Sequence, residues 1–133
     1  MIRVFADTSF YVALVSPKDQ WHSLAARAAQ EHFDMVTTEF VLIEVGNFLH
    51  RQPDREMFIG LLQTLSGDDQ TTIVPASTQL FEAGSRLYSE RPDKDWSFTD
   101  CTSFVVMNDL KLVSALSNDH YFRQAGFQLL MSD

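Results

Sequence analysis

The chain has 133 residues, 45% of them hydrophobic and 21% charged, a balance typical of a folded globular protein and not of a disordered one. No stretch approaches the roughly 18 uninterrupted apolar residues of a membrane span, and one cysteine, Cys101, excludes an intrachain disulfide and a multi-cysteine zinc site. The formal net charge of −8 argues against a broadly basic phosphate-binding surface and suggests carboxylates gathered around a cation.

We find no repeat, low-complexity run or linker in residues 1–133, so we expect a single domain. Charged residues come too early in the chain for a secretory signal peptide, and we therefore expect a cytoplasmic protein without a membrane partner.

Short β-rich runs alternate with longer helical runs, which predicts an α/β fold with a mostly parallel sheet of about five strands covered by helices. In chain order we expect a strand over 2–6, helices over 7–14 and 19–32, a strand over 35–37, helices over 39–50 and 55–65, a strand over 71–74, helices over 77–89 and 98–110, a strand over 112–115, a helix over 119–124 and a strand over 127–130. Asp19, Thr38 and Asp54 are the predicted N-caps of the helices that follow them.

Two aspartates follow predicted strands directly. Asp7 comes after the first strand, and Asp119 comes after the strand over 112–115. Ligands of open α/β sheets bind outside the carboxyl ends of the strands, so both positions suit chemistry. Each aspartate could equally be a helix N-cap.

Glu44 stands on a predominantly apolar helix face. Its neighbours at three and four residues are Phe40, Val41, Asn47 and Phe48. A carboxylate buried there needs a cation or donors, or it takes up a proton, unless the helix is turned so that Glu44 meets water. A salt bridge to an arginine is the structural alternative, and the candidates are Arg51, Arg86 and Arg91.

Asp100 completes a predicted capping box with Ser97 at the start of a helix that is apolar on several sides. Asp95 lies five residues earlier and could line the same positive helix end. Three or four carboxylates in one cleft repel each other unless a divalent cation joins them, and oxygen ligands favour Mg²⁺ or Mn²⁺.

These segments together resemble the PIN domain family and, within it, the toxin ribonucleases of the VapC type. The resemblance rests on VFADTS at 4–9, TEFVLIEV at 38–45, DWSFTDC at 95–101, SNDHYF at 117–122 and AGF at 125–127, which occur in family order. It implies a three-layer α/β/α sandwich around a mostly parallel sheet.

The resemblance also implies an activity and a site. The activity is Mg²⁺- or Mn²⁺-dependent hydrolysis of RNA that leaves 5′-phosphate and 3′-hydroxyl ends. The acidic cluster would be Asp7, Glu44, Asp100 and Asp119, with Asp95 as a possible additional acid and the Ser9 hydroxyl beside the metal. An antitoxin partner and a homodimer are further implied.

Several other residues could either bind RNA or a partner or have a purely structural role. Arg86 and Arg91 could meet phosphates or form solvated surface, and Trp96 could stack on a base or anchor its own loop. An apolar stripe could be core, a dimer surface or an antitoxin-binding surface; it comprises Met57, Phe58, Leu61, Leu62 and Leu65.

Three other functions compete with this interpretation. A dehalogenase-like phosphatase needs Asp-x-Asp where this chain has Asp7-Thr8-Ser9, and a receiver domain needs an acid after the strand over 71–74, where Pro75 follows. A catalytically inert module of the same fold, binding RNA or protein, remains the main alternative.

Overall fold

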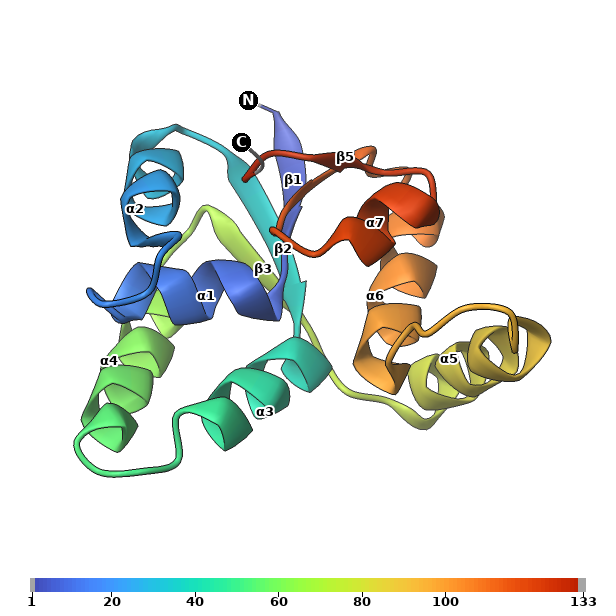
Figure 1. The fold of residues 1–133 in the computed structure, drawn as a ribbon, viewed down its shortest axis with the longest axis horizontal. Coiled ribbons are helices and arrows are strands. Elements are labelled where there is room, and N and C mark those ends of the chain that lie inside the picture. The colour runs from blue at the N-terminus through green and yellow to red at the C-terminus, as the bar shows by residue number, and fades with distance from the viewer. Residues whose placement is uncertain (1, 132–133) are drawn as a thin grey trace.

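The computed structural model describes residues 2–131, which form a five-stranded, entirely parallel sheet flanked by seven helices (Figure 1). The strand order across the sheet is β3-β2-β1-β4-β5. The strands are β1 (Arg3–Ala6), β2 (Asp34–Thr38), β3 (Thr71–Val74), β4 (Ser114–Leu116) and β5 (Gln128–Leu129). The predicted α/β class and parallel sheet are confirmed.

The seven helices of residues 2–131 connect the strands, and from the central strand β1 the chain adds strands first on one side of the sheet and then on the other. They are α1 (Thr8–Val15), α2 (His22–Gln30), α3 (Glu39–Phe48), α4 (Asp54–Ser66), α5 (Thr78–Glu90), α6 (Phe98–Asp109) and α7 (His120–Gln124). The first crossovers lead from β1 outward to β2 and β3, and the chain then returns through α5 and α6 to β4 on the other side of β1. The order therefore reverses between β1 and β4, where open α/β sheets form their binding crevice.

The sheet lies between two helical layers, as expected for a three-layer sandwich. Helices α1, α2 and α4 lie on one side, α5, α6 and α7 lie on the other, and α3 lies near the carboxyl ends of the strands (Figure 1). The central strand is buried on both faces, with Val4, Phe5 and Ala6 all fully inaccessible to solvent. This continuous apolar run is what a parallel strand covered on both faces requires.

Local capping explains where two helices begin. The Thr38 hydroxyl accepts from the backbone N–H of Val41 at 3.0 Å and starts α3, as predicted. The Ser97 hydroxyl accepts from the Asp100 N–H at 3.0 Å while Oδ2 of Asp100 accepts from the Ser97 N–H at 3.0 Å, which is the predicted capping box of α6. Both motifs satisfy N–H groups that lack partners within the helix.

Two predicted caps are wrong. Oδ1 of Asp19 accepts from the Trp21 N–H at 2.8 Å in the turn before α2, so Trp21 and not Asp19 is the N-cap. Asp54 lies within the first turn of α4, whose N-cap is Pro53. The Asp19 carboxylate thus closes a local turn two residues long, which is the competing use of an aspartate near a helix start, whereas the cis Gln52–Pro53 segment occupies the cap position before Asp54.

Some element ends also differ from expectation. Helix α2 ends at Gln30 and not at 32, and β4 begins at Ser114 and not at 112. The N–H of Leu112 bonds to the carbonyl of Met107 at 2.8 Å, which ties that residue to the end of α6 and delays the strand. Within residues 2–131, no helix has both the length and the apolar character needed to cross a bilayer.

Candidate active site

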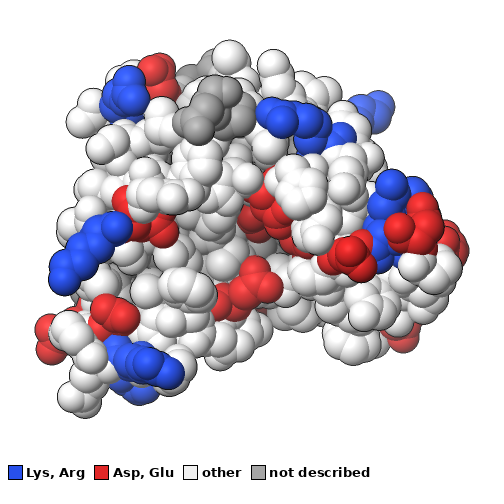
Figure 2. Space-filling model, in the orientation of Figure 1, with Lys and Arg blue, Asp and Glu red and all other residues white. Residues whose placement is uncertain are grey.

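A cleft of about 520 Å³ opens at the carboxyl ends of β1 and β4, between α1 and α3 on one side and α6 and α7 on the other. Six acidic side chains are among its lining residues: Asp7, Asp19, Glu44, Asp95, Asp100 and Asp119. Lys, Arg and His are absent from the lining, as far as residues 2–131 describe it. Figure 2 shows Asp and Glu gathered in the hollow of this face, with Lys and Arg toward the edges of the molecule.

Asp7 forms the floor of the cleft. Its N–H continues the sheet by donating to the Leu116 carbonyl at 3.1 Å, and its side chain is only 4% exposed. Oδ2 of Asp7 accepts from the Ser117 hydroxyl at 2.9 Å. A buried carboxylate is thus fixed at the strand-order reversal, where the sequence predicted an aspartate with chemical use.

Glu44 reaches the cleft from α3. Its Oε1 accepts a 2.5 Å hydrogen bond from the Thr8 hydroxyl at the start of α1, and its side chain is half-buried. Helix α3 is rotated so that Val41 and Val45 are buried, while Phe48 is 68% exposed. Glu44 therefore lies at the boundary between core and cleft and not in the core.

The predicted arginine partners of Glu44 do not pair with it. Within residues 2–131, the only contacts between acidic and basic side chains at ion-pair distance are Arg91–Asp93 and a 3.9 Å approach of His120 to Asp119. Arg51 and Arg86 are both exposed. The salt-bridge explanation of Glu44 is wrong in this structure.

Asp100 and Asp119 are both helix caps and cleft residues. Asp119 caps α7 by accepting from the Tyr121 N–H through Oδ1 at 2.9 Å, and Asp100 caps α6 as described above. The sequence offered capping and site use as alternatives for these residues, and the structure shows that the capping bonds leave both of them in the lining of the cleft.

Ser9 and Asp95 lie at the sides of the same cleft. The Ser9 hydroxyl accepts from the Asn118 N–H at 3.2 Å and lies 3.3 Å from the Ser117 hydroxyl. Asp95 is exposed on the loop before α6. Both positions agree with the placement that the sequence suggested, close to the four other acids.

Burial and mutual repulsion raise the pKa of two of these carboxyls. Burial raises the pKa of Asp7 to about 7, with the nearby charges of Asp100 and Glu44 adding to the effect. Burial likewise raises the pKa of Asp100 to about 6, helped by Asp119 and Glu44. Hydrogen bonds from Ser117 and Ser97 act in the opposite direction. Without a cation, the ionised forms of Asp7 and Asp100 are therefore destabilised by burial and by the neighbouring carboxylates.

A profile of the PIN domain family matches residues 4–128, which is nearly the whole chain. The chain belongs to the PIN domain family. PIN domains are metal-dependent nucleases as a class, and they generally use divalent ions. The sequence resemblance to this family is thereby confirmed.

The chain is similar to VapC20 of Mycobacterium tuberculosis, named as a 23S rRNA-specific endonuclease. The identity is 27% over 125 residues, which cover 93% of this chain and 95% of VapC20. The crystal structure of VapC20, described as a sarcin-ricin loop cleaving toxin, superposes with a TM-score of 0.83 at 26% identity over 93% of this chain and 95% of that one.

Two further solved structures share the fold. VapBC2 from Rickettsia felis, solved with a DNA fragment from their promoter, gives a TM-score of 0.67 at 13% identity and covers 97% of both chains. FitAcB from Neisseria gonorrhoeae gives 0.65 at 14% identity and covers 95% of both chains.

The donor set of this PIN domain suits a divalent ion, although the ligands are not pre-assembled. All candidate ligands are carboxylate or hydroxyl oxygens, which Mg²⁺ and Mn²⁺ prefer. Within residues 2–131, no three Asp, Glu, His or Cys side chains stand close enough together to hold an ion as they are. Unshielded carboxylates repel each other, and Asp7, Glu44, Asp100 and Asp119 each direct one oxygen to a hydroxyl or backbone donor instead.

Sequence reasoning missed several residues that shape the cleft. Asp19 was treated only as a cap, and Thr8 and Ser117 were given no individual role, yet Thr8 holds Glu44 and Ser117 holds Asp7. The signal for Ser117 was its position two residues before Asp119, after β4.

The two arginines considered for phosphate binding lie outside the cleft. Arg91 forms two 2.9 Å hydrogen bonds to Asp93 and lies over the Trp96 ring, with 5.0 Å between the guanidinium carbon and the ring centroid. Trp96 is 6% exposed and donates to Gln124 at 3.2 Å, so it anchors its loop and is closed to base stacking. Cys101 is a free cysteine buried in the core.

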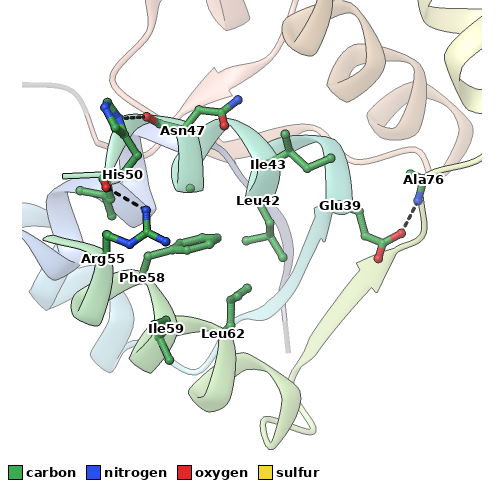
Figure 3. Close-up of a pocket in the computed structure, with 12 residues that line it drawn as sticks. Glu39, Leu42, Ile43, Asn47, His50, Arg55, Phe58, Ile59, Leu62 and Ala76 are labelled. Carbon is green, nitrogen blue, oxygen red and sulfur yellow. Dashed lines mark hydrogen bonds between the residues drawn. The ribbon is translucent and has the colours of Figure 1, made fainter. Parts of the chain in front are cut away.

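A second, largely apolar groove of about 670 Å³ runs between α3 and α4 (Figure 3). Leu42 and Ile43 from α3 face Phe58, Ile59 and Leu62 from α4. The apolar stripe predicted on α4 thus divides: Leu61 and Leu65 are core, whereas Phe58 and Leu62 line the groove.

Proposed function

We propose that this protein is a metal-dependent endoribonuclease that hydrolyses RNA phosphodiester bonds. The observation that carries the proposal is the convergence of Asp7, Glu44, Asp100 and Asp119, from four distant segments, on one cleft. Among residues 2–131, no Lys, Arg or His side chain lines that cleft. Membership of the PIN domain family and the likeness to VapC20 support the same conclusion.

The four carboxylates are the proposed metal ligands, with Asp95 as a possible fifth. Mg²⁺ or Mn²⁺ is the ion we favour, since the donors are all oxygen. Bound there, a divalent ion would polarise the scissile phosphate, acidify a water molecule and stabilise the leaving oxygen.

The chain's own residues prepare the cleft for that role. Each of the four carboxylates has one oxygen engaged by a hydroxyl or backbone donor, which fixes its orientation. The Ser9 hydroxyl accepts from the Asn118 N–H beside them, and in this proposal it would orient a water molecule or a phosphate oxygen. Negative charge alone would repel the RNA backbone, so substrate enters only when the acids are neutralised.

Ribosomal RNA is the substrate class that we favour, because VapC20 is named for 23S rRNA and matches over 93% of this chain. Arg86 and Arg91 are weaker candidates for phosphate contacts, since both lie outside the cleft and Arg91 is paired with Asp93.

The proposal extends to partners. We propose that an antitoxin protein covers the α3–α4 groove. We also propose that residues 1–133 form a single domain, that two such chains form a homodimer, and that the protein is cytoplasmic. The groove exposes Ile43 (55%) and Ile59 (52%), an apolar surface that a partner would bury. Coexpression with the product of the adjacent gene tests this, because Ile59→Glu should abolish a complex that Ile2→Glu leaves intact.

Cleavage of RNA by the purified protein tests the enzymatic proposal. We expect cleavage with Mg²⁺ or Mn²⁺, none in EDTA, and a loss of at least about 100-fold in Asp7→Asn, Glu44→Gln, Asp100→Asn or Asp119→Asn. Glu56→Gln, which removes an exposed acid from α4 outside the cleft, is the matched control and should cleave normally. Tight RNA binding by the wild type without any cleavage would favour the inert module instead.

A further inference from the structure

Three aromatic side chains form an exposed group on α5 and the start of α6, which we call the aromatic shelf. It comprises Phe81, Tyr88 and Phe98. The ring of Phe98 lies 5.1 Å from that of Phe81 and 5.6 Å from that of Tyr88, centroid to centroid. Phe81 and Tyr88 are each 52% exposed, so about half of each side chain still faces water.

The shelf has a rigid backing. Phe81, Gly84 and Tyr88 are spaced by three and four residues and share one face of α5. At Gly84 the helix approaches α6 so closely that an added Cβ would lie 2.6 Å from Cγ2 of Thr102. The rings of Phe81 and Tyr88 therefore lie on either side of a close contact between α5 and α6, and both neighbour the ring of Phe98.

The shelf is continuous with the acidic cleft. A hollow of about 590 Å³ is lined by Tyr88, Lys94 and Arg91 together with Asp95 and Ser97. Asp95 and Ser97 also line the acidic cleft, and Ser97 precedes Phe98 in the chain. A chain of nucleotides that leaves the cleft at this side would pass through the hollow and reach the shelf.

The hollow carries the cations that the cleft lacks. Lys94 has no acidic side chain at ion-pair distance in the part of the chain that the structure describes. Arg91 is held in place by Asp93 and by the Trp96 ring, and its charge is largely balanced by Asp93. Lys94 is thus the group best suited to a phosphate, next to rings suited to bases.

We propose that the aromatic shelf and Lys94 form a subsite for unpaired nucleotides of the RNA substrate, beside the scissile phosphate in the acidic cleft. Exposed rings stack on any base whose face is free, which selects loops and single strands over duplex RNA. This inference rests on the proposed ribonuclease function, and it adds a part of the surface that distinguishes unpaired nucleotides from duplex RNA.

Binding measurements on an inactive background test the subsite. The Glu44→Gln protein is titrated, with Mg²⁺ present, into a fluorescein-labelled RNA hairpin with an unpaired loop and into a blunt duplex of the same stem, and anisotropy reports Kd. Phe81→Ala and Tyr88→Ala should each weaken hairpin binding about tenfold, with little effect on the duplex. Lys94→Ala should weaken binding to both RNAs and make it less dependent on salt.

Matched variants separate stacking from folding. Tyr88→Phe and Phe81→Tyr keep a ring and should bind like the parent, and Ile59→Ala, at the same 52% exposure in the other groove, should too. Hairpin affinity within about twofold of the parent in both ring-to-Ala variants would overturn the subsite. A dimer lost in those variants with unchanged RNA affinity would assign the shelf to a second copy and also overturn it.

Cleavage by the wild-type protein separates the two proposals. Cleavage together with unchanged hairpin binding in both ring-to-Ala variants would overturn the subsite alone. Hairpin binding that depends on the shelf, without cleavage by the wild type, would overturn the nuclease and support the subsite.

Discussion

The hydroxyl of Ser117 donates a 2.9 Å hydrogen bond to Oδ2 of Asp7, joining residues 110 positions apart in sequence at the ends of β4 and β1. The same hydroxyl accepts from the N–H of Asp119 at 3.0 Å. One serine therefore fixes two of the proposed metal ligands relative to each other, at the reversal of strand order.

Replacing Ser117 with alanine should destabilise the protein and weaken metal binding. Asp7 would lose its hydroxyl donor in a buried position, so we expect a loss of about 1–3 kcal/mol in the free energy of unfolding at pH 8. Ser103→Ala is the matched control, since the Ser103 hydroxyl is fully buried and has no hydrogen-bond partner among the described residues. Urea unfolding should show Ser103→Ala near wild type, and equal losses in both variants would contradict the role of Ser117.

Asp7→Asn should stabilise the metal-free protein at alkaline pH while abolishing cleavage. The pKa of Asp7 rises from 3.8 to about 7 on folding, so the folded state binds this proton more tightly than the unfolded state. Stability from this group is full below about pH 4, falls as the pH rises, and is lost above about pH 7.

The asparagine lacks that penalty, so the variant should exceed wild type by up to about 4 kcal/mol at pH 8 in EDTA. The difference should close by pH 4. Unfolding curves across this range provide the measurement. A variant less stable than wild type at pH 8 would show that ionised Asp7 does not destabilise the folded protein.

Divalent ions should raise the thermal midpoint, and the effect should depend on pH. An ion at 100 times its Kd adds about 2.7 kcal/mol to folding stability, which corresponds to several degrees for a domain of this size. Asp7 and Asp100 must lose protons to bind it, and their pKa values are raised to about 7 and about 6. The shift should therefore be large at pH 8 and small at pH 5, and a shift that grows on acidification would count against these ligands.

The sequence predicted the local features well. Thr38 and the Ser97–Asp100 box were correct because these caps depend on residues within one turn. Asp19 and Asp54 were wrong because the helices after them begin at Trp21 and Pro53 as N-caps. Asp7 and Asp119 were placed by the rule that parallel strands end at one edge.

The sequence could not show features that depend on how helices pack. The apolar face around Glu44 left its partner open between a cation, hydrogen-bond donors, water and an arginine, and only the rotation of α3 shows that the donor is Thr8, 36 residues away. Asp19 was expected to cap a helix, and its place in the lining of the cleft depends on how the turn after α1 folds back.

Alanine should have opposite effects at two helical glycines, because Gly84 lies in the close contact of α5 with α6 and Gly60 faces open space. Gly84→Ala would force a Cβ against Thr102 and should cost about 1–3 kcal/mol. Gly60→Ala on α4 meets nothing within 4 Å and should gain about 0.4–1 kcal/mol from helix propensity and reduced chain entropy. Thermal unfolding of both variants checks the pair, and a neutral Gly84→Ala would contradict the tight helix contact.

The central claim is that four carboxylates from separate segments close around a divalent ion in the cleft. Anomalous diffraction from crystals soaked in Mn²⁺ tests it most directly. We expect a strong anomalous peak within coordination distance of Asp7, Glu44, Asp100 and Asp119, and its loss in Asp7→Asn. A fully soaked crystal with manganese only elsewhere on the surface, or none at all, would contradict the claim.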